Sequence, residues 1–180
     1  MKAKLLEALG DCKFVVSCIC VEKSSFENIT NSTFFVYDEL DSTLQRPVRV
    51  VTNMSNYQLT VNNPSNNHIC LIKTDKCLFT DETKKCDCIL FDNQQFFMVE
   101  IKTASSGAKS KRRKDAVKQL EITIGLLKEK SIDLSSHTTT ALICFKSNEP
   151  RIIQASRNSS AAIFKEKYGI RLQEGNVIDF

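Results

Sequence analysis

Two acidic side chains and one lysine lie at the ends of two apolar runs in the middle of the chain. Asp87 lies near the start of the run 86–91, and Glu100 and Lys102 end the run 96–102. Carboxylates bind hard divalent cations such as Mg²⁺, and an ammonium group offsets negative charge on a phosphate. These residue types are the ones that metal-assisted hydrolysis of a phosphodiester requires.

The two runs are expected to be strands of one hairpin. They flank the four-residue connection 92–95, and loops of this length commonly join antiparallel strands. Closure on this loop places Phe91 opposite Phe96. The register of all the other pairs follows from that one.

Counting outward in this register pairs Ile89 with Met98 and then Asp87 with Glu100. Opposed residues on paired strands have β-carbons about 5 Å apart, and two like charges at that separation are destabilising. Residues two apart on a strand share a face, so Lys102 joins Glu100. The sequence therefore predicts two neighbouring carboxylates that need positive charge.

A divalent cation supplies that charge. Mg²⁺ keeps several of its waters and needs few protein ligands, which are here predicted to be Asp87, Glu100 and the backbone carbonyl of Ile101. Lys102 is then placed to orient the attacking water or to offset developing negative charge. The side chains of Val99 and Ile101 are predicted to point to the opposite face.

A simpler interpretation is an amphipathic hairpin whose solvent face carries an Asp, a Glu and a Lys. A Glu-x-Lys sequence alone is too common to identify a site. The flanking residues favour the metal site, because both runs are apolar on both faces and leave no obvious solvent side. The residues alone leave both interpretations open.

The segments KCDCIL at 85–90 and FMVEIK at 97–102, followed by a helix containing KQL at 118–120, resemble the PD-(D/E)xK nuclease superfamily. The resemblance covers residues 84–145. It implies a restriction-endonuclease-like mixed sheet flanked by helices, dependence on Mg²⁺ or Mn²⁺, and cleavage of DNA or, in some members, RNA. By position it makes Asp87 and Glu100 metal ligands, Lys102 the catalytic lysine, and Gln119 a further residue of the site.

The chain departs from the superfamily pattern in two places. Cys86 stands where the proline of the motif is found. The superfamily often adds an acidic metal ligand from an N-terminal helix, and Glu7 is the natural candidate for that role. Its competitors are Glu22, Glu39 and Glu82.

A dense basic run follows the candidate site. Its members are Lys109, Lys111, Arg112, Arg113, Lys114 and Lys118. Cations near a helix N-terminus oppose the helix dipole, so a bound anion would relieve them, and a nucleic-acid backbone supplies one. The other interpretation is an ordinary solvated helix face.

The remaining pattern predicts an α/β fold with a β-rich N-terminal extension. Apolar spacing predicts helices at 1–9, 110–130 and 159–168. Strands are predicted at 14–21, 34–37, 48–51, 57–61, 69–72, 139–145 and 151–156, followed by an extended tail. With no linker in 180 residues, we expect a single domain over 1–180, with a nuclease-like core at 84–146 and a β-rich part at 12–80.

Cysteine content and hydropathy set further expectations. Zinc ligation by Cys70, Cys77, Cys86 and Cys88 is disfavoured, because their spacing lacks the usual Cys-x2-4-Cys knuckles. No export signal and no apolar stretch of membrane-spanning length is seen, so reduced thiols, a cytoplasmic location and no membrane partner are expected.

The expected function is a metal-dependent endonuclease acting on DNA or RNA, in a prokaryotic restriction or antiphage system. A homodimer is expected if both strands of a duplex are cut, and the resemblance suggests a separate ATPase partner. No phosphate-binding glycine loop is present, so ATP binding within this chain is not expected. The alternatives are a catalytically inactive nucleic-acid-binding or assembly subunit with the same fold, and a protein-binding module.

Overall fold

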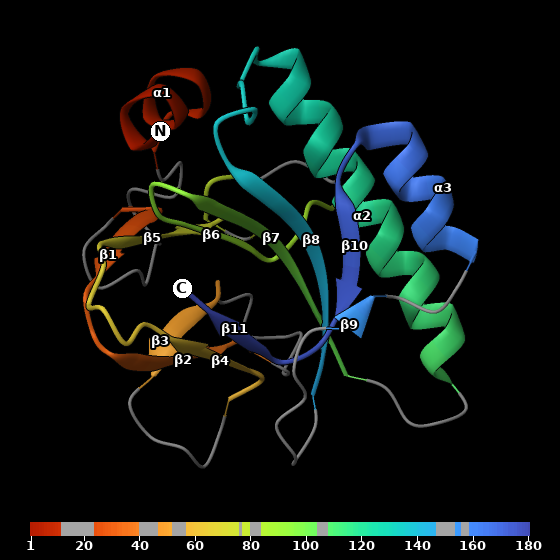
Figure 1. The fold of residues 1–180 in the computed structure, drawn as a ribbon, viewed down its shortest axis with the longest axis horizontal. Helices are drawn as coiled ribbons and strands as arrows, with labels where there is room; N and C mark the ends of the chain where they lie inside the picture. The colour runs from red at the N-terminus through yellow and green to blue at the C-terminus, as the bar shows by residue number, and fades with distance from the viewer. Residues whose placement is uncertain are drawn as a thin grey trace.

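In the computed structural model, the described part of the chain folds into layers of helices, a larger sheet and a smaller sheet (Figure 1). The larger sheet lies in the middle and has an apolar core on each face. The residues that the structure describes are 1–11, 24–39, 47–51, 57–75, 77–79, 84–103, 108–146, 154–155 and 159–180. The predicted strand 14–21 and most of the predicted strand 151–156 lie outside them.

The central sheet mixes antiparallel and parallel pairings. Its strands, in spatial order, are β1 (Phe26–Ile29), β5 (Ile69–Lys73), β6 (Cys88–Phe91), β7 (Gln95–Lys102), β8 (Thr138–Phe145), β10 (Arg171–Glu174) and β9 (Gln154–Ala155). Pairing is antiparallel from β1 to β7 and parallel from β7 through β8 to β10. A parallel pair needs a crossover connection, and the long helix α2 (Lys109–Glu129) supplies it between β7 and β8.

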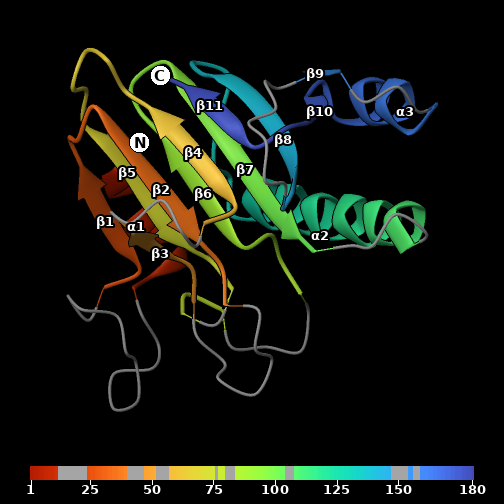
Figure 2. The same ribbon diagram turned by 90° about the horizontal axis from the view of Figure 1, so that it is seen from below.

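The smaller sheet covers one face of the central sheet (Figure 2). Its strands, in spatial order, are β11 (Val177–Asp179), β4 (Leu59–Asn62), β2 (Thr33–Tyr37) and β3 (Arg49–Val51). Val36 and Val61 share an apolar core with Leu71, Leu90 and Val99 of the central sheet. Because β11 pairs with β4, the last strand of the chain completes a sheet built from its N-terminal half.

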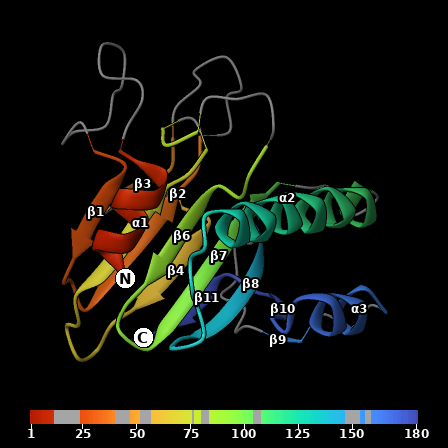
Figure 3. The same ribbon diagram turned by 90° about the horizontal axis from the view of Figure 1, so that it is seen from above.

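Helices cover the other face of the central sheet. α1 (Lys2–Leu9) lies over the side of β1 and β5, whereas α2 contacts β7 and β8, and α3 (Ser159–Tyr168) contacts β10 (Figure 3). Leu120, Ile124 and Leu127 of α2 are buried at the predicted helical spacing and share a core with Ile89 and Met98. Among the described residues, no helix has the length and apolar character needed to cross a membrane.

The elements predicted from the sequence are mostly confirmed. The predicted strands 34–37, 48–51, 57–61 and 69–72 correspond to β2, β3, β4 and β5, with ends shifted by at most two residues. The predicted helices correspond to α1, α2 and α3, and the extended tail forms β10 and β11. The prediction missed β1, because Phe26 and Ile29 are its only apolar residues and two serines precede them.

The β-rich part at 12–80 is more than an extension. Its strands β1 and β5 belong to the central sheet, and every residue of β5 is buried. The mixed α/β class is confirmed, but the expectation of a sheet flanked by helices is corrected. Helices cover one face and the smaller sheet covers the other, because the strands in the middle of the sheet are apolar on both sides.

Ile178 tests whether β11 stabilises the layer between the sheets. It is completely buried there, so we expect Ile178→Ala to lower the free energy of unfolding by about 2 to 5 kcal/mol. Ile163 of α3 is 60% exposed and provides a matched control, since Ile163→Ala should change stability by less than about 0.5 kcal/mol. Urea denaturation measures both, and equal effects of the two substitutions would contradict the placement of β11.

Candidate active site

The hairpin of β6 and β7 has the register predicted from its loop. The pairs are Cys88 with Val99, Ile89 with Met98, Leu90 with Phe97 and Phe91 with Phe96. Asp87 immediately precedes β6, so one further step in the same register places it opposite Glu100. The electrostatic influence of Asp87 on Glu100 agrees with this closeness.

The next hydrogen-bonded pair of this ladder would be Cys86 with Ile101. The Asp92 N–H donates to the Gln95 carbonyl at 3.1 Å, and hydrogen-bonded pairs recur at every second residue of an antiparallel ladder. Continuing that alternation through β6 brings Cys86 and Ile101 to the following position. There the backbone groups bond to side chains instead.

Three of the four backbone polar groups of this pair bond to side chains. The Cys86 N–H donates to Thr123 Oγ1 at 2.9 Å, and the Cys86 carbonyl accepts from the Thr74 hydroxyl. The Ile101 N–H donates to Asp87 Oδ2 at 2.6 Å. The Asp87 carboxylate is therefore fixed at the end of β6, against the backbone of β7.

The carbonyl of Ile101 lies on the same side of β7 as Asp87. Both backbone groups of a strand residue point to the same neighbour, and successive residues alternate between the two neighbours. The Lys102 carbonyl accepts from the Lys146 N–H at 3.0 Å on the β8 side, so the groups of Ile101 face β6. The side chains of Val99 and Ile101 lie in the core between the sheets, as predicted.

Glu100, Lys102 and Gln119 come together beneath α2. Glu100 is 0% exposed, and its Oε1 contacts Lys102 Nζ. Lys102 Nζ also donates to Gln119 Oε1 at 2.7 Å. The second oxygen, Glu100 Oε2, is buried and has no hydrogen-bond partner in the described structure. A buried, ionised carboxylate oxygen without a donor is costly, and a neighbouring cation would reduce that cost.

Burial opposes the charged forms of both acids. It raises the pKa of Asp87 to about 8, with a further increase from Asp38 and a decrease from Lys102. Burial and then the charge of Asp87 raise the pKa of Glu100 well above its usual range. Burial opposes the charge of Lys102, but Glu100 and Asp87 raise its pKa overall, so Lys102 stays an ammonium. Two buried carboxyls thus share this one ammonium, and a further cation would let both ionise.

The candidate oxygens are of the type that a hard divalent cation binds. They are Glu100 Oε2, the Asp87 carboxylate and the Ile101 carbonyl. Within the described residues, no group of three or more His, Cys, Asp or Glu side chains is arranged to hold a metal ion. A metal at this position would therefore rely on two carboxylates, one backbone carbonyl and water, a ligand set that suits Mg²⁺.

The structure adds residues that the sequence did not single out. Asp38 directly follows β2 and Asp75 lies just after β5, and both raise the pKa of Asp87. The position of both acids at strand ends could have identified them from the sequence as candidate site residues. Thr74 and Thr123 gave no signal, because their bonds to Cys86 join residues that are far apart in the sequence.

Glu7 does not join the two acids. Leu5 and Leu9 form the buried side of α1, which leaves Glu7 on the exposed side. It belongs to no metal-binding group among the described residues. The competing acids are Glu39, which accepts a hydrogen bond from the Tyr37 hydroxyl, and Glu22 and Glu82, which lie outside the described residues.

The basic run begins α2 and divides into bonded and exposed members. Arg113 bonds to Glu174 of β10, with an Nη2 to Oε2 distance of 3.0 Å. Lys109 Nζ lies 4.8 Å from the centre of the Phe145 ring. The exposed members are Lys111, Arg112, Lys114 and Lys118. The first turn of α2 has no acidic residue and no side-chain cap, so its N-terminus is positive.

The cysteines considered for zinc lie buried within the protein. Burial raises the pKa of Cys70 to about 11 and that of Cys86 to about 12, which keeps both thiols protonated at neutral pH. Residues two apart on a regular strand share a face, but Cys86 and Cys88 lie on opposite faces of the sheet. Cys86 lies in the helix-side core and Cys88 between the sheets, because the chain leaves the ladder at Cys86.

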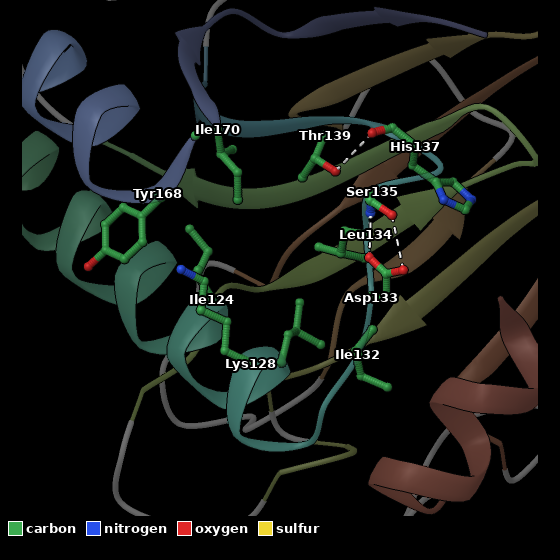
Figure 4. A pocket seen from close by; sticks show the side chains of 12 residues that line it. Ile124, Lys128, Ile132, Asp133, Leu134, Ser135, His137, Thr139, Tyr168 and Ile170 are labelled. Carbon is green, nitrogen blue, oxygen red and sulfur yellow. Dashed lines mark hydrogen bonds between the residues drawn. The ribbon is translucent and has the colours of Figure 1, made fainter.

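A pocket of about 390 Å³ lies near the start of β8, between the last turns of α2 and α3 (Figure 4). Its lining mixes apolar and polar side chains, and Asp133 accepts from the backbone and hydroxyl of Ser135 at 2.8 and 3.0 Å. Cys144 pairs with Ile101 near the other end of β8. The pocket and the paired acids therefore lie at opposite ends of the sheet.

Comparisons with protein-family models, with curated proteins and with solved structures find no match. The functional interpretation therefore depends on the arrangement of Asp87, Glu100, Lys102 and Gln119. No relative contributes to it.

Binding of Mn²⁺ or Mg²⁺ tests the fit of the metal. A ligand that binds the folded state alone stabilises it, by about 2.7 kcal/mol at a hundredfold excess over Kd, so the melting temperature should rise. Glu100→Gln removes an anionic ligand and should abolish the increase. Glu129→Gln, at the exposed end of α2, is the matched control. An equal increase in the Glu100→Gln variant would contradict the site.

Proton competition gives the same site a pH dependence. Burial raises the pKa of Asp87 to about 8 and raises that of Glu100 well above its usual range, and a metal binds their deprotonated forms. The affinity for Mn²⁺ should therefore increase as the pH rises from about 6 to about 9, measured by titration calorimetry. An affinity that is independent of pH would show that these carboxyls are not the ligands.

Proposed function

We propose that this chain is a metal-dependent endonuclease with a restriction-endonuclease-like core, which hydrolyses phosphodiester bonds in DNA. Asp87, Glu100 and the Ile101 carbonyl would hold Mg²⁺ or Mn²⁺, and Lys102 would be the catalytic lysine. The observation that carries the proposal is the unpartnered, fully buried Glu100 Oε2 beside a second buried acid. A structural ion pair with Lys102 alone would leave Glu100 Oε2 without a partner and would leave two buried acids with one ammonium between them.

The metal would lower the pKa of a bound water and offset negative charge on the phosphate. The remaining tasks fall to side chains of this chain. Lys102 Nζ keeps its charge next to Glu100 and donates a hydrogen bond to the amide oxygen of Gln119 at 2.7 Å. The ammonium is thereby held where it can orient the attacking water or stabilise the developing negative charge.

The exposed lysines of α2 support a nucleic-acid substrate. Lys111, Lys114 and Lys118 recur at steps of three and four, which places them along one exposed side of the helix. Lys118 directly precedes Gln119, whose side chain reaches Lys102. A phosphate backbone that follows this side of α2 would therefore arrive close to the paired acids.

Replacing Lys102 tests the catalytic role. We expect Lys102→Met to reduce cleavage of plasmid DNA in Mg²⁺ by at least about a hundredfold, because the positioned charge is removed. Lys130→Met removes an exposed lysine at the other end of α2 and should cleave as the unchanged protein does.

The same assay separates the alternative of an inactive subunit with this fold. Salt-sensitive DNA binding without cleavage in either Mg²⁺ or Mn²⁺ would favour that alternative. Cleavage by Lys102→Met at the rate of the unchanged protein would refute the role given to Lys102. EDTA should abolish all cleavage.

The basic side of α2 has its own test. Replacing Lys111, Lys114 and Lys118 together with Ala should weaken duplex binding and make its salt dependence shallower, by about 0.9 in log-log slope for each phosphate that is no longer neutralised. A triple variant of Lys4, Lys130 and Lys165 removes the same charge from other exposed positions. Fluorescence anisotropy at several salt concentrations measures both, and equal slopes would place the DNA elsewhere.

A further inference from the structure

Thr123 of α2 is buried beside the paired acids and has no part in the chemistry described so far. It is 1% exposed. Its Oγ1 accepts the Cys86 N–H at 2.9 Å and donates to the Gln119 carbonyl at 3.0 Å. The helix that carries Gln119 is therefore bonded directly to the residue that precedes Asp87.

The bond is unusual because the sheet itself offers Cys86 a partner. In the register of β6 and β7, the Cys86 N–H would donate to the Ile101 carbonyl, and the Ile101 N–H would donate to the Cys86 carbonyl. That ladder would satisfy all of these buried groups without any side chain. A purely structural role therefore gives no reason for Thr123 to take the Cys86 N–H.

The bonds from Cys86 to Thr123 and Thr74 leave the backbone N–H and carbonyl of Ile101 without their partners in the ladder. With the Cys86 N–H bonded to Thr123, the Ile101 carbonyl loses the donor that the ladder assigns to it. With the Cys86 carbonyl bonded to Thr74, the Ile101 N–H is available to Asp87 Oδ2. Both consequences concern oxygen atoms on the β6 side of Ile101, the residue that follows Glu100.

We propose that Thr123 is a positioning residue of the metal site: by taking the Cys86 N–H, it leaves the Ile101 carbonyl available as an oxygen ligand. Thr74 acts in the same way on the Cys86 carbonyl and so allows Asp87 to accept the Ile101 N–H. This inference rests on the proposed function for the identity of the ligand as a divalent cation. Their roles would be indirect, because the hydroxyls of both threonines bond to the backbone.

Thr123→Val, Thr123→Ser and Thr140→Val form the test set. Valine keeps the shape of threonine but lacks the hydroxyl, so the Cys86 N–H returns to the Ile101 carbonyl and the affinity for Mn²⁺ should fall by at least about tenfold. Serine keeps the hydroxyl and should restore the affinity. Thr140 is a buried threonine of β8 that pairs with Phe97 and Arg171 away from the acids, so Thr140→Val should bind Mn²⁺ normally.

Titration calorimetry with Mn²⁺ alone gives the affinity, and amide hydrogen exchange without metal gives the backbone state. In Thr123→Val the Cys86 amide should stay protected, because the ladder bond replaces the bond to the hydroxyl. Unchanged Mn²⁺ affinity in Thr123→Val would overturn the proposal, and so would equal losses in Thr123→Val and Thr123→Ser. If Thr123→Val does not fold, Thr74→Val tests the bond to the Cys86 carbonyl, and unchanged affinity there overturns the proposal equally.

The experiment distinguishes this inference from the proposed function. Weakened Mn²⁺ binding in Thr123→Val, with no DNA cleavage by the unchanged protein, would support the positioning role and refute the nuclease. DNA cleavage with equal Mn²⁺ affinity in all the variants would support the nuclease and refute the positioning role. No Mn²⁺ binding by the unchanged protein would refute both.

Discussion

The arrangement around the site depends on two carboxyl groups that share one ammonium in the interior of the protein. Glu100 is completely buried, Asp87 is nearly so, and Lys102 contacts Glu100. Burial disfavours the charged form of each acid, and the two acids disfavour each other. A cation that binds between them relieves both penalties at once. The charge deficit is therefore the strongest physical reason to expect a divalent metal here.

The layered fold buries the carboxyl groups of Asp87 and Glu100. The smaller sheet covers one face of the β6–β7 hairpin and α2 covers the other, so Asp87 and Glu100 are almost completely buried, whereas the side chain of Lys102 stays 16% exposed. The same layers supply the groups that end the ladder, since Thr123 comes from α2 and Thr74 follows β5. Strand pairing thus stops where side chains from two neighbouring elements replace it. The carboxylate of Asp87 occupies the position that this leaves.

Local patterns predicted the hairpin well, because its register depends on one short loop and on apolar residues next to it. The face shared by Glu100 and Lys102 followed from strand periodicity alone, and the approach of Gln119 from the resemblance. Thr74 and Thr123 were not predictable, since no local pattern shows which distant hydroxyl will meet the backbone of Cys86. Glu7 lies on the exposed side of α1, because Leu5 and Leu9 form the buried side, and no sequence pattern shows where that helix packs.

On the proposed function, one helix connects the chemistry to the substrate. α2 carries Gln119 on its inner side and exposed lysines on its outer side, and its N-terminus adds the positive end of the helix dipole. Lysines in the first turns oppose that dipole, so the free protein carries a repulsion that bound phosphates would remove. Arg113 is already compensated by Glu174. A bound phosphate would therefore be stabilised more by Lys111, Lys114 and Lys118 than by Arg113. These lysines follow the helix toward Gln119, whose side chain contacts Lys102.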